Sequence, residues 1–189
     1  MARYMSVIHF GAAAICALAY LSAPAASQDT AKSEEASSED PGPCTDAAYR
    51  AFDFWLGVWD VETPDGQIAG RNLITSEEDG CLVLEQWMSA GGTTGQSYNY
   101  YNPATAKWHQ TWVSRDAVIE YSGGPEGAAA MRLNGTISYR DGTRYPFRGE
   151  WVPQDGGVIR QSFEQYNYET GVWESWFVGL YRPATETDG

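Results

Sequence analysis

The stretch "FDFWLGVWDV", Phe52 to Val61, decides the fold expected for this chain. It places Trp59 two residues after Gly57, in a run of apolar residues that is typical of a β-strand. Glycine lets the backbone bend, and a large indole beside it needs a closed, apolar space. Because side chains alternate along a strand, Trp55, Trp59 and Val61 are expected to point to the same, inward side.

The rest of the chain repeats one pattern, in which a run rich in aromatic and β-branched residues is followed by a turn signal. The runs cover residues 54–62, 67–75, 81–89, 95–102, 107–114, 117–124, 129–139, 144–152, 158–168 and 172–182. The turns between them, such as "TPDG" and "RDGT", contain the residues that tight turns require. This pattern predicts an all-β, antiparallel up-and-down barrel of about ten strands, in which closure leaves no edge strand. The alternative is a sandwich of two sheets.

One short helix is expected before the first strand, in "TDAAYRAF", with Thr45 as its N-cap. A barrel of this size has an interior that side chains can fill or that can hold one small ligand.

The N-terminal region is expected to be separate from the barrel. Residues 1–27 combine an early arginine, an apolar run and small residues at the end, which is typical of a secretory signal peptide; the alternative is an uncleaved anchor. Residues 28–43 carry five acids against one lysine and no aromatic residue, which indicates a disordered acidic tether. Residues 44–189 are then the barrel domain, and the protein is expected to be periplasmic or secreted.

Two cysteines, Cys44 and Cys81, follow the expected cleavage site. In an exported protein such a pair is interpreted as a disulfide, which would tie the segment before the first strand to the strand beginning at Cys81. The alternative is two buried thiols.

The charge of the domain excludes some partners. From residue 44 onward there are ten basic and twenty acidic side chains, and the basic ones are scattered singly. Binding to nucleic acid or to an anionic membrane would need a basic stripe. Neither a nucleic-acid partner nor membrane insertion after processing is therefore expected, and the sequence leaves the oligomeric state open.

The order of motifs resembles that of lipocalin-like (calycin) barrels. In these barrels a Gly-x-Trp opens the first strand and an arginine from the last strand covers the indole. The resemblance implies structural roles for Gly57, Trp59 and Arg182, the arginine of "GLYRP". The segments "AGRNLI", "GCLVLEQW", "SYNYYNP" and "WHQTWV" extend it to a family of exported bacterial lipocalin-like domains of unassigned function. Many members carry an acidic residue where this chain has Val58. The family implies a fold but no reaction.

Several kinds of chemistry lack the residues that they need. His109 is the one histidine after the signal peptide, so no metal site is expected. The last strands hold no histidine to ligate haem, no Ser lies in a "GxSxG" elbow, and no glycine-rich loop precedes a helix. The sequence therefore predicts no cofactor.

The candidate site consists of polar residues within apolar strands, next to aromatic residues that would form a cavity wall. The predicted ligand-binding residues are Glu85, Trp87, Tyr98, Tyr100, Trp108, Gln110, Trp112 and Arg160. Aromatic residues occupy both faces of several strands, so alternation does not decide which residues face inward. The plainer interpretation is that the polar residues are exposed on the outside of the barrel.

Three functions fit this sequence. The first is the binding of a small apolar or aromatic molecule in the cavity, the usual construction of a small-molecule site. The second is a cofactor-independent isomerase, hydratase or lyase on the same barrel, using Glu85, His109 and Arg160 for acid–base catalysis. The third is a structural, envelope-associated domain with a solid core. Because a fold does not determine a function, the interior of the barrel has to decide among them.

Overall fold

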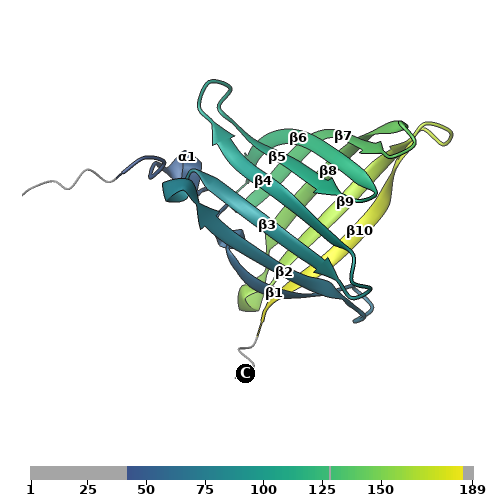
Figure 1. Ribbon diagram of the computed structural model, residues 1–189, viewed down its shortest axis with the longest axis horizontal. Coiled ribbons are helices and arrows are strands. Elements are labelled where there is room, and N and C mark those ends of the chain that lie inside the picture. The colour runs from purple at the N-terminus through teal and green to yellow at the C-terminus, as the bar shows by residue number, and fades with distance from the viewer. Residues whose placement is uncertain (1–41, 128, 185–189) are drawn as a thin grey trace, which may run out of the picture. The chain divides into compact units, whose positions relative to one another are not determined.

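Ten antiparallel strands close into one barrel in this computed structural model, which describes residues 42–127 and 129–184 (Figure 1). The strands are β1 (Gly57–Glu62), β2 (Ile68–Glu77), β3 (Leu82–Ser89), β4 (Thr94–Asn102), β5 (Lys107–Ser114), β6 (Ala117–Glu126), β7 (Ala130–Tyr139), β8 (Arg144–Pro153), β9 (Ile159–Asn167) and β10 (Val172–Pro183). Each strand pairs with its neighbours in the sequence, and β1 pairs with β10 to complete the ring. The predicted up-and-down barrel is confirmed, and the sandwich alternative is wrong.

Each run expected from the sequence corresponds to one strand, because the turns fix where the strands end. Gly66 and Gly142 adopt φ angles of +82° and +86° in the β1–β2 and β7–β8 turns, a region that glycine enters without strain. Single turns of 3-10 helix lie in the connections before β3, η2 (Glu78–Gly80), and before β9, η3 (Asp155–Gly157).

The opening of β1 explains the Gly-x-Trp. The strand begins at Gly57, whose φ of +138° bends the chain, while Trp55 lies in a preceding 3-10 turn, η1 (Asp53–Trp55). Trp59 is buried, and its indole Nε1 donates a hydrogen bond of 2.9 Å to the Trp55 carbonyl oxygen. Trp55 and Val61 are fully buried as well. The inward direction of all three side chains is therefore as expected, although Trp55 reaches the interior from η1 rather than from the strand.

Arg182 does not cover Trp59, and that expectation is wrong. Along β10, Tyr181 is buried and Arg182 is exposed, so the arginine side chain leaves the barrel on the outer face. There its Nε lies 3.0 Å from Glu62 Oε2 on the paired strand β1. The Trp59 ring instead meets Tyr181 edge-on inside the barrel, with ring centroids 6.3 Å apart. Strand alternation places neighbouring residues on opposite faces, and Tyr181 occupies the inner one.

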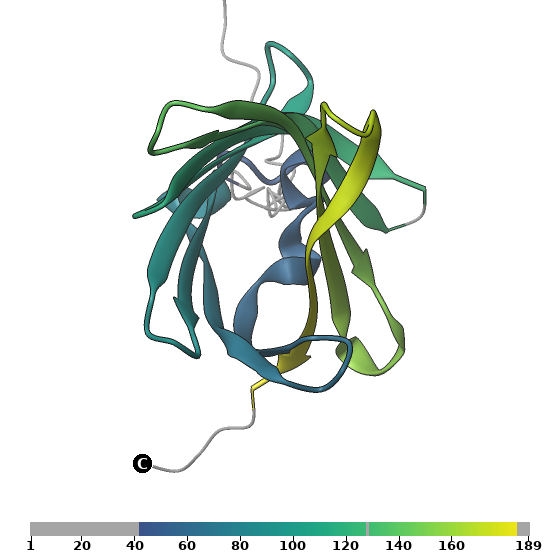
Figure 2. The same ribbon diagram turned by 90° about the vertical axis from the view of Figure 1, so that its right-hand side faces the viewer.

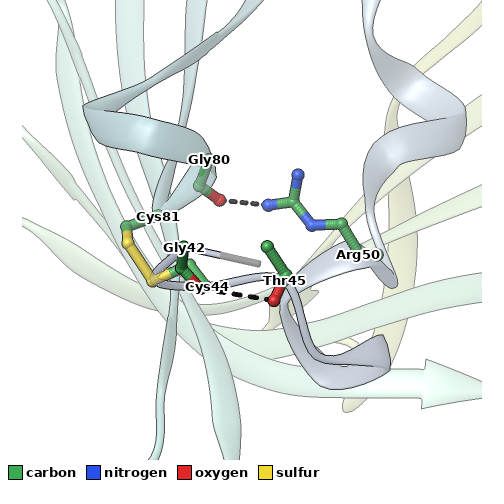
Figure 3. The surroundings of a disulfide bond; sticks show 6 residues. All are labelled: Gly42, Cys44, Thr45, Arg50, Gly80 and Cys81. Atoms are coloured by element: carbon green, nitrogen blue, oxygen red, sulfur yellow. Dashed lines mark hydrogen bonds between the residues drawn. A yellow bond between two sulfur atoms is a disulfide. The ribbon is translucent and has the colours of Figure 1, made fainter. Parts of the chain in front are cut away.

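The segment before η1 contains the short helix and the disulfide (Figure 3). The N-cap position of helix α1 (Ala47–Arg50) is Asp46, one residue after the predicted Thr45, and its side chain makes no capping hydrogen bond. The Thr45 hydroxyl donates to the Gly42 carbonyl oxygen at 3.4 Å. Cys44 and Cys81 are bonded, with their Cα atoms 5.1 Å apart, which confirms the predicted disulfide. Arg50 of α1 also donates a hydrogen bond to the carbonyl oxygen of Gly80, the residue before Cys81. The segment is thus bonded at two points to the residues that directly precede β3.

One end of the barrel is filled by an aromatic floor. Figure 1 shows α1 at the left-hand end of the barrel, and in the view along the barrel in Figure 2 the segment that contains α1 and η1 lies within the outline of the ring of strands. From this segment Phe52 stacks on Trp55 at 5.0 Å between ring centroids and meets Trp151 of β8 at 5.2 Å and Trp108 of β5 at 5.6 Å. The Trp108 indole donates a hydrogen bond of 2.9 Å to the Ala48 carbonyl oxygen in α1. We call these four aromatic residues the floor.

The predicted signal peptide, residues 1–27, and most of the predicted tether, residues 28–43, lie outside the described residues. Of the predicted barrel domain, the structure describes the ten strands and the segment that leads into them.

Candidate ligand-binding cavity

A layer of polar side chains crosses the barrel above the floor. Three strands reach it with the same inward order, apolar then polar then aromatic: Val83, Glu85 and Trp87 on β3; Trp108, Gln110 and Trp112 on β5; Ile159, Gln161 and Phe163 on β9. The polar members lie between the floor and the far end of the barrel. The layer, called here the polar belt, consists of Asn72, Glu85, Ser97, Asn99, Gln110, Tyr121, Gln161 and Tyr181.

Glu85 lies at the centre of the polar belt. Glu85 is only 4 % exposed to solvent. Its two carboxyl oxygens accept hydrogen bonds from Ser97 Oγ at 2.5 Å and from Asn72 Nδ2 at 2.7 Å. Burial raises the pKa of this carboxyl to about 7, while the bonds from Ser97 and Asn72 act in the opposite direction. Glu85 can therefore gain or lose a proton near neutral pH.

A directed chain of donors leads to Glu85 from the far side of the belt. Tyr121 donates its hydroxyl proton to Gln110 Oε1, and Gln110 Nε2 donates to Asn99 Oδ1. Asn99 Nδ2 donates to Ser97 Oγ at 2.9 Å, and Ser97 donates to Glu85. Donors aligned in one direction polarise each other and strengthen the bond at the accepting end. The chain therefore favours negative charge at the carboxyl, against the effect of burial.

A second arm of the belt reaches Glu85 through Asn72. Asn72 Nδ2 lies 3.3 Å from the Tyr181 hydroxyl, which donates in turn to Gln161 Oε1. Burial first, and the charge of Glu85 second, raise the pKa of both Tyr121 and Tyr181, so both phenols stay protonated near neutral pH. Asn72 Oδ1 is buried and has no hydrogen-bond partner among the described residues.

Above the belt lies a cavity of about 190 Å³. Its polar side is formed by Glu85, Gln110, Gln161 and Tyr181 of the belt. Its other side is formed by aromatic residues, called here the cavity wall: Trp87, Trp112, Phe163, Trp176 and Phe177. The site therefore combines an apolar wall with a few polar groups that converge on one side, which is the usual construction of a small-molecule site.

A β-bulge in β10 brings two consecutive aromatic residues to this cavity. The pairing with β9 shifts between Ser175 and Phe177, so Trp176 is the extra residue and both Trp176 and Phe177 line the cavity. Trp176 is 48 % exposed, and its indole donates to the Tyr139 hydroxyl at 3.1 Å. Trp176 therefore lies where the cavity meets solvent.

Glycines make room for the rings of the wall. A Cβ atom at Gly70 would lie 2.7 Å from the Trp87 indole, and one at Gly179 would lie 2.8 Å from the Phe177 ring. Both distances are shorter than packed carbon atoms allow. The absence of a side chain at these positions therefore lets each ring pack closely against the backbone of a strand.

The structure brings four of the predicted ligand-binding residues together. Glu85 and Gln110 lie on the polar side of the cavity, and Trp87 and Trp112 lie in its wall. Trp108 faces inward too, but it belongs to the floor and is covered by α1. Its predicted place in the wall is therefore wrong.

Four other predicted residues face outward, so their assignment to the site is corrected. On β4, Ser97 and Asn99 take the inner positions to complete the belt, which turns Tyr98 and Tyr100 to the outside. His109 stacks on Tyr100 there, with centroids 5.4 Å apart. Arg160 alternates with the inward Gln161 and donates to Ser162 Oγ at 3.2 Å. Glu85 accordingly has neither His109 nor Arg160 beside it.

Sequence reasoning missed several residues of the site. They are Asn72, Ser97, Asn99, Tyr121, Gln161, Phe163, Trp176, Phe177 and Tyr181. The signal for two of them was present, because "IRQSF" repeats on β9 the apolar, polar, aromatic order of "VLEQW" and "WHQTW" at alternate positions. Trp176 carried no such signal, since a bulge interrupts the alternation.

A larger hollow, about 770 Å³, lies on the outer face of the barrel. Exposed apolar side chains line it, among them Leu73, Met88, Tyr98 and Val113. Its volume exceeds that of the inner cavity, but none of the buried polar side chains in the described part of the chain reaches it. Its place inside the barrel and its convergent polar groups make the inner cavity the better candidate site.

No protein-family model matches this chain, and no curated protein that was compared with it is similar in sequence. The fold and the cavity therefore carry the functional argument.

Proposed function

We propose that this protein is an exported lipocalin-like barrel that binds one small apolar or aromatic molecule in the inner cavity. The observation that carries the proposal is the space inside the barrel between the polar belt and the cavity wall. A closed barrel of this size commonly holds a single small ligand. The resemblance to exported bacterial lipocalin-like domains supports the same class.

The volume limits the ligand to a small molecule. Drug-sized ligands need pockets of roughly 300–1,000 Å³, whereas an apolar cavity of about 150 Å³ takes benzene. A cavity of about 190 Å³ fits a single ring with small substituents. Rings of this size can stack against Trp87 and Trp112 while one polar substituent reaches Glu85.

Export is part of the proposal. The disulfide between Cys44 and Cys81 fits an oxidising compartment, and the predicted signal peptide supplies the route. Among the described residues no helix combines the length and the apolar character that a membrane crossing requires.

A second candidate function is acid–base catalysis by Glu85. The observation that favours it is the carboxyl with a pKa of about 7 beside a cavity, since an acid or base works best when its pKa is near the working pH. The absence of His109 and Arg160 from the cavity removes the partners that this function was expected to use. Binding is therefore the function that the site supports best, and an interior cavity argues against a solid structural core.

The proposal is tested by titrating the full exported chain with benzyl alcohol, a soluble single-ring probe, while the indole N–H signals are followed by NMR. We expect saturable shifts at Trp112 and Trp176, which line the inner cavity, with one molecule bound per chain. Trp173, which lies under Arg148 at 4.3 Å from its ring centre, is the control tryptophan and should not shift. The methyl signal of Met88 reports on the outer hollow.

A matched pair of variants locates the probe. Trp112→Leu should weaken binding severalfold, because it removes part of the wall, whereas Trp173→Leu should leave binding unchanged. Saturable shifts at Met88 with none at Trp112 would move the site to the outer hollow. No saturable shift at any of these residues would reject the proposal.

A further inference from the structure

The interior of the barrel contains one acidic side chain and no basic one, among the residues that the structure describes. Glu85 is buried, and the remaining buried polar side chains apart from the tyrosines, Asn72, Ser97, Asn99, Gln110 and Gln161, are neutral. The arginines of the surrounding strands lie outside: Arg148 pairs with Glu164 at 2.6 Å, and Arg160 donates to Ser162. When Glu85 is ionised, the cavity therefore holds a negative charge with no positive partner.

The polar belt solvates this charge but does not neutralise it. The groups that face Glu85 from the packed strands are Asn72 of β2, Ser97 of β4, Tyr121 of β6 and Tyr181 of β10. All four are uncharged near neutral pH. Ser97 donates one hydrogen bond to Oε2 of Glu85, and Asn72 donates one to Oε1. A carboxylate can accept about four hydrogen bonds, so capacity remains for a donor that enters from the cavity.

The opposite side of the cavity is suited to positive charge. The faces of aromatic rings attract cations, tryptophan most strongly, and the wall contains Trp87, Trp112 and Trp176. Aromatic cages next to a carboxylate favour alkylammonium groups, because the rings attract the charge and contact the methyl or methylene groups at once. The net charge of the chain, −13, also favours the approach of cations over anions.

We infer that the ligand of this cavity is a small organic cation, an amine or quaternary ammonium compound whose charged nitrogen lies between Glu85 and the tryptophans of the wall. This inference rests on the proposed function and specifies the chemical class of its ligand. An ammonium ion would supply the positive charge that the described interior lacks, and its apolar groups would fill the wall side. An anionic ligand would meet the uncompensated charge of Glu85 and is disfavoured.

The test compares choline with 3,3-dimethylbutan-1-ol, a pair of nearly equal shape in which only choline is charged. At pH 8 we expect choline to bind the full exported chain at least tenfold more tightly, as measured by calorimetry and by the shift of the Trp112 indole signal. Choline has no titrating group of its own in this range. Its affinity should fall about tenfold from pH 8 to pH 6 as Glu85 takes up a proton, while the affinity of the alcohol should change little.

Glu85→Gln removes the charge and keeps the shape. We expect this variant to lose the preference for choline and its pH dependence, yet to bind 3,3-dimethylbutan-1-ol within about twofold of the unaltered chain. Glu120→Gln, on the outer face of β6, is the matched control and should behave like the unaltered chain. If Glu85→Gln does not fold, the pH dependence of the unaltered chain still decides the question.

The outcomes separate this inference from the proposed function. Equal binding of choline and the alcohol at pH 8, together with benzyl alcohol in the cavity, would overturn the cation inference and leave the cavity proposal intact. Failure of all three probes to bind would overturn both. Choline affinity that is independent of pH would show that Glu85 is not the counter-ion and would also overturn the inference.

Discussion

The two ends of this barrel are both lined by aromatic side chains, yet one is solid and the other encloses a cavity. At the floor, the segment that contains η1 inserts Phe52 and Trp55 between the strands, where they pack on Trp108 and Trp151 at 5.2–5.6 Å between ring centroids. At the other end, the wall around Trp112 encloses about 190 Å³. Aromatic content alone thus does not distinguish a core from a site. The difference is whether a further segment of the chain fills the space.

The largest expected effect is the loss of stability when a tryptophan of the floor is removed, compared with the loss for a tryptophan of the cavity wall. Trp151→Ala should lower the free energy of unfolding by about 3–5 kcal/mol, as for other fully buried aromatic residues. Trp112→Ala should lower it by about half as much, because Trp112 borders a cavity and already lacks neighbours on one side. Urea unfolding followed by circular dichroism measures both losses. Equal losses would mean that the two ends are packed alike.

The disulfide holds the floor in place and gives the next largest effect. Cys44 and Cys81 are 37 residues apart, and a bond that closes a loop of this length stabilises by about 3–4 kcal/mol in the entropic account. The double variant Cys44→Ser and Cys81→Ser should lose that amount, measured by the same urea unfolding. The unaltered chain with added reductant is the control and should show a similar loss. A much smaller loss would show that α1 and η1 dock without the bond.

The polar belt, between the two ends, gives a pH dependence that the floor lacks. Glu85 has a pKa of about 7 in the folded chain against an ordinary value of 4.5, so the folded state binds the proton more tightly. This stabilisation is present below pH 4.5 and is lost as the pH rises through 7, by about 3 kcal/mol in total. The difference in unfolding free energy between the unaltered chain and Glu85→Gln should therefore change by this amount between pH 4.5 and pH 8.

The difference in unfolding free energy should change in one direction only. Raising the pH should destabilise the unaltered chain relative to Glu85→Gln, in which Asn72 can turn its unpaired Oδ1 towards the new amide. Glu120→Gln, on the outer face, should follow the unaltered chain. A difference that does not vary with pH would place an ordinary, solvated carboxyl at position 85.

The fold was predictable because its determinants are local. The glycine, proline, asparagine and aspartate residues of the turns end the strands through their own backbone preferences. Closure follows because a ring of strands leaves no strand without a partner on either side. The N-cap position was one residue off, at Asp46 instead of Thr45, since the exact end of a short helix depends on contacts beyond its own residues.

The candidate site was only half predictable because the face of each strand depends on contacts between strands. On β4 the larger residues, Tyr98 and Tyr100, would be expected inside by size. Glu85, however, accepts a hydrogen bond from Ser97, which in turn accepts one from Asn99, so these two residues face inward. The hydrogen bonds of one buried carboxyl therefore decide the orientation of a neighbouring strand. The sequence of one strand alone does not show which hydrogen bonds a residue on the neighbouring strand requires.

The smallest expected effect concerns Arg182, which the resemblance placed over the Trp59 indole and the structure places outside. Its ion pair with Glu62 is half-exposed, and such pairs contribute about 0.2–1 kcal/mol. A double-mutant cycle of Arg182→Ala with Glu62→Ala should therefore show coupling of this size, which added salt should weaken. The cycle of Arg182→Ala with Trp59→Ala should be additive, because the two side chains lie on opposite faces of their strands. Strong coupling to Trp59 with none to Glu62 would restore the arginine to the interior and would also bring a positive charge into a barrel where Glu85 now has none.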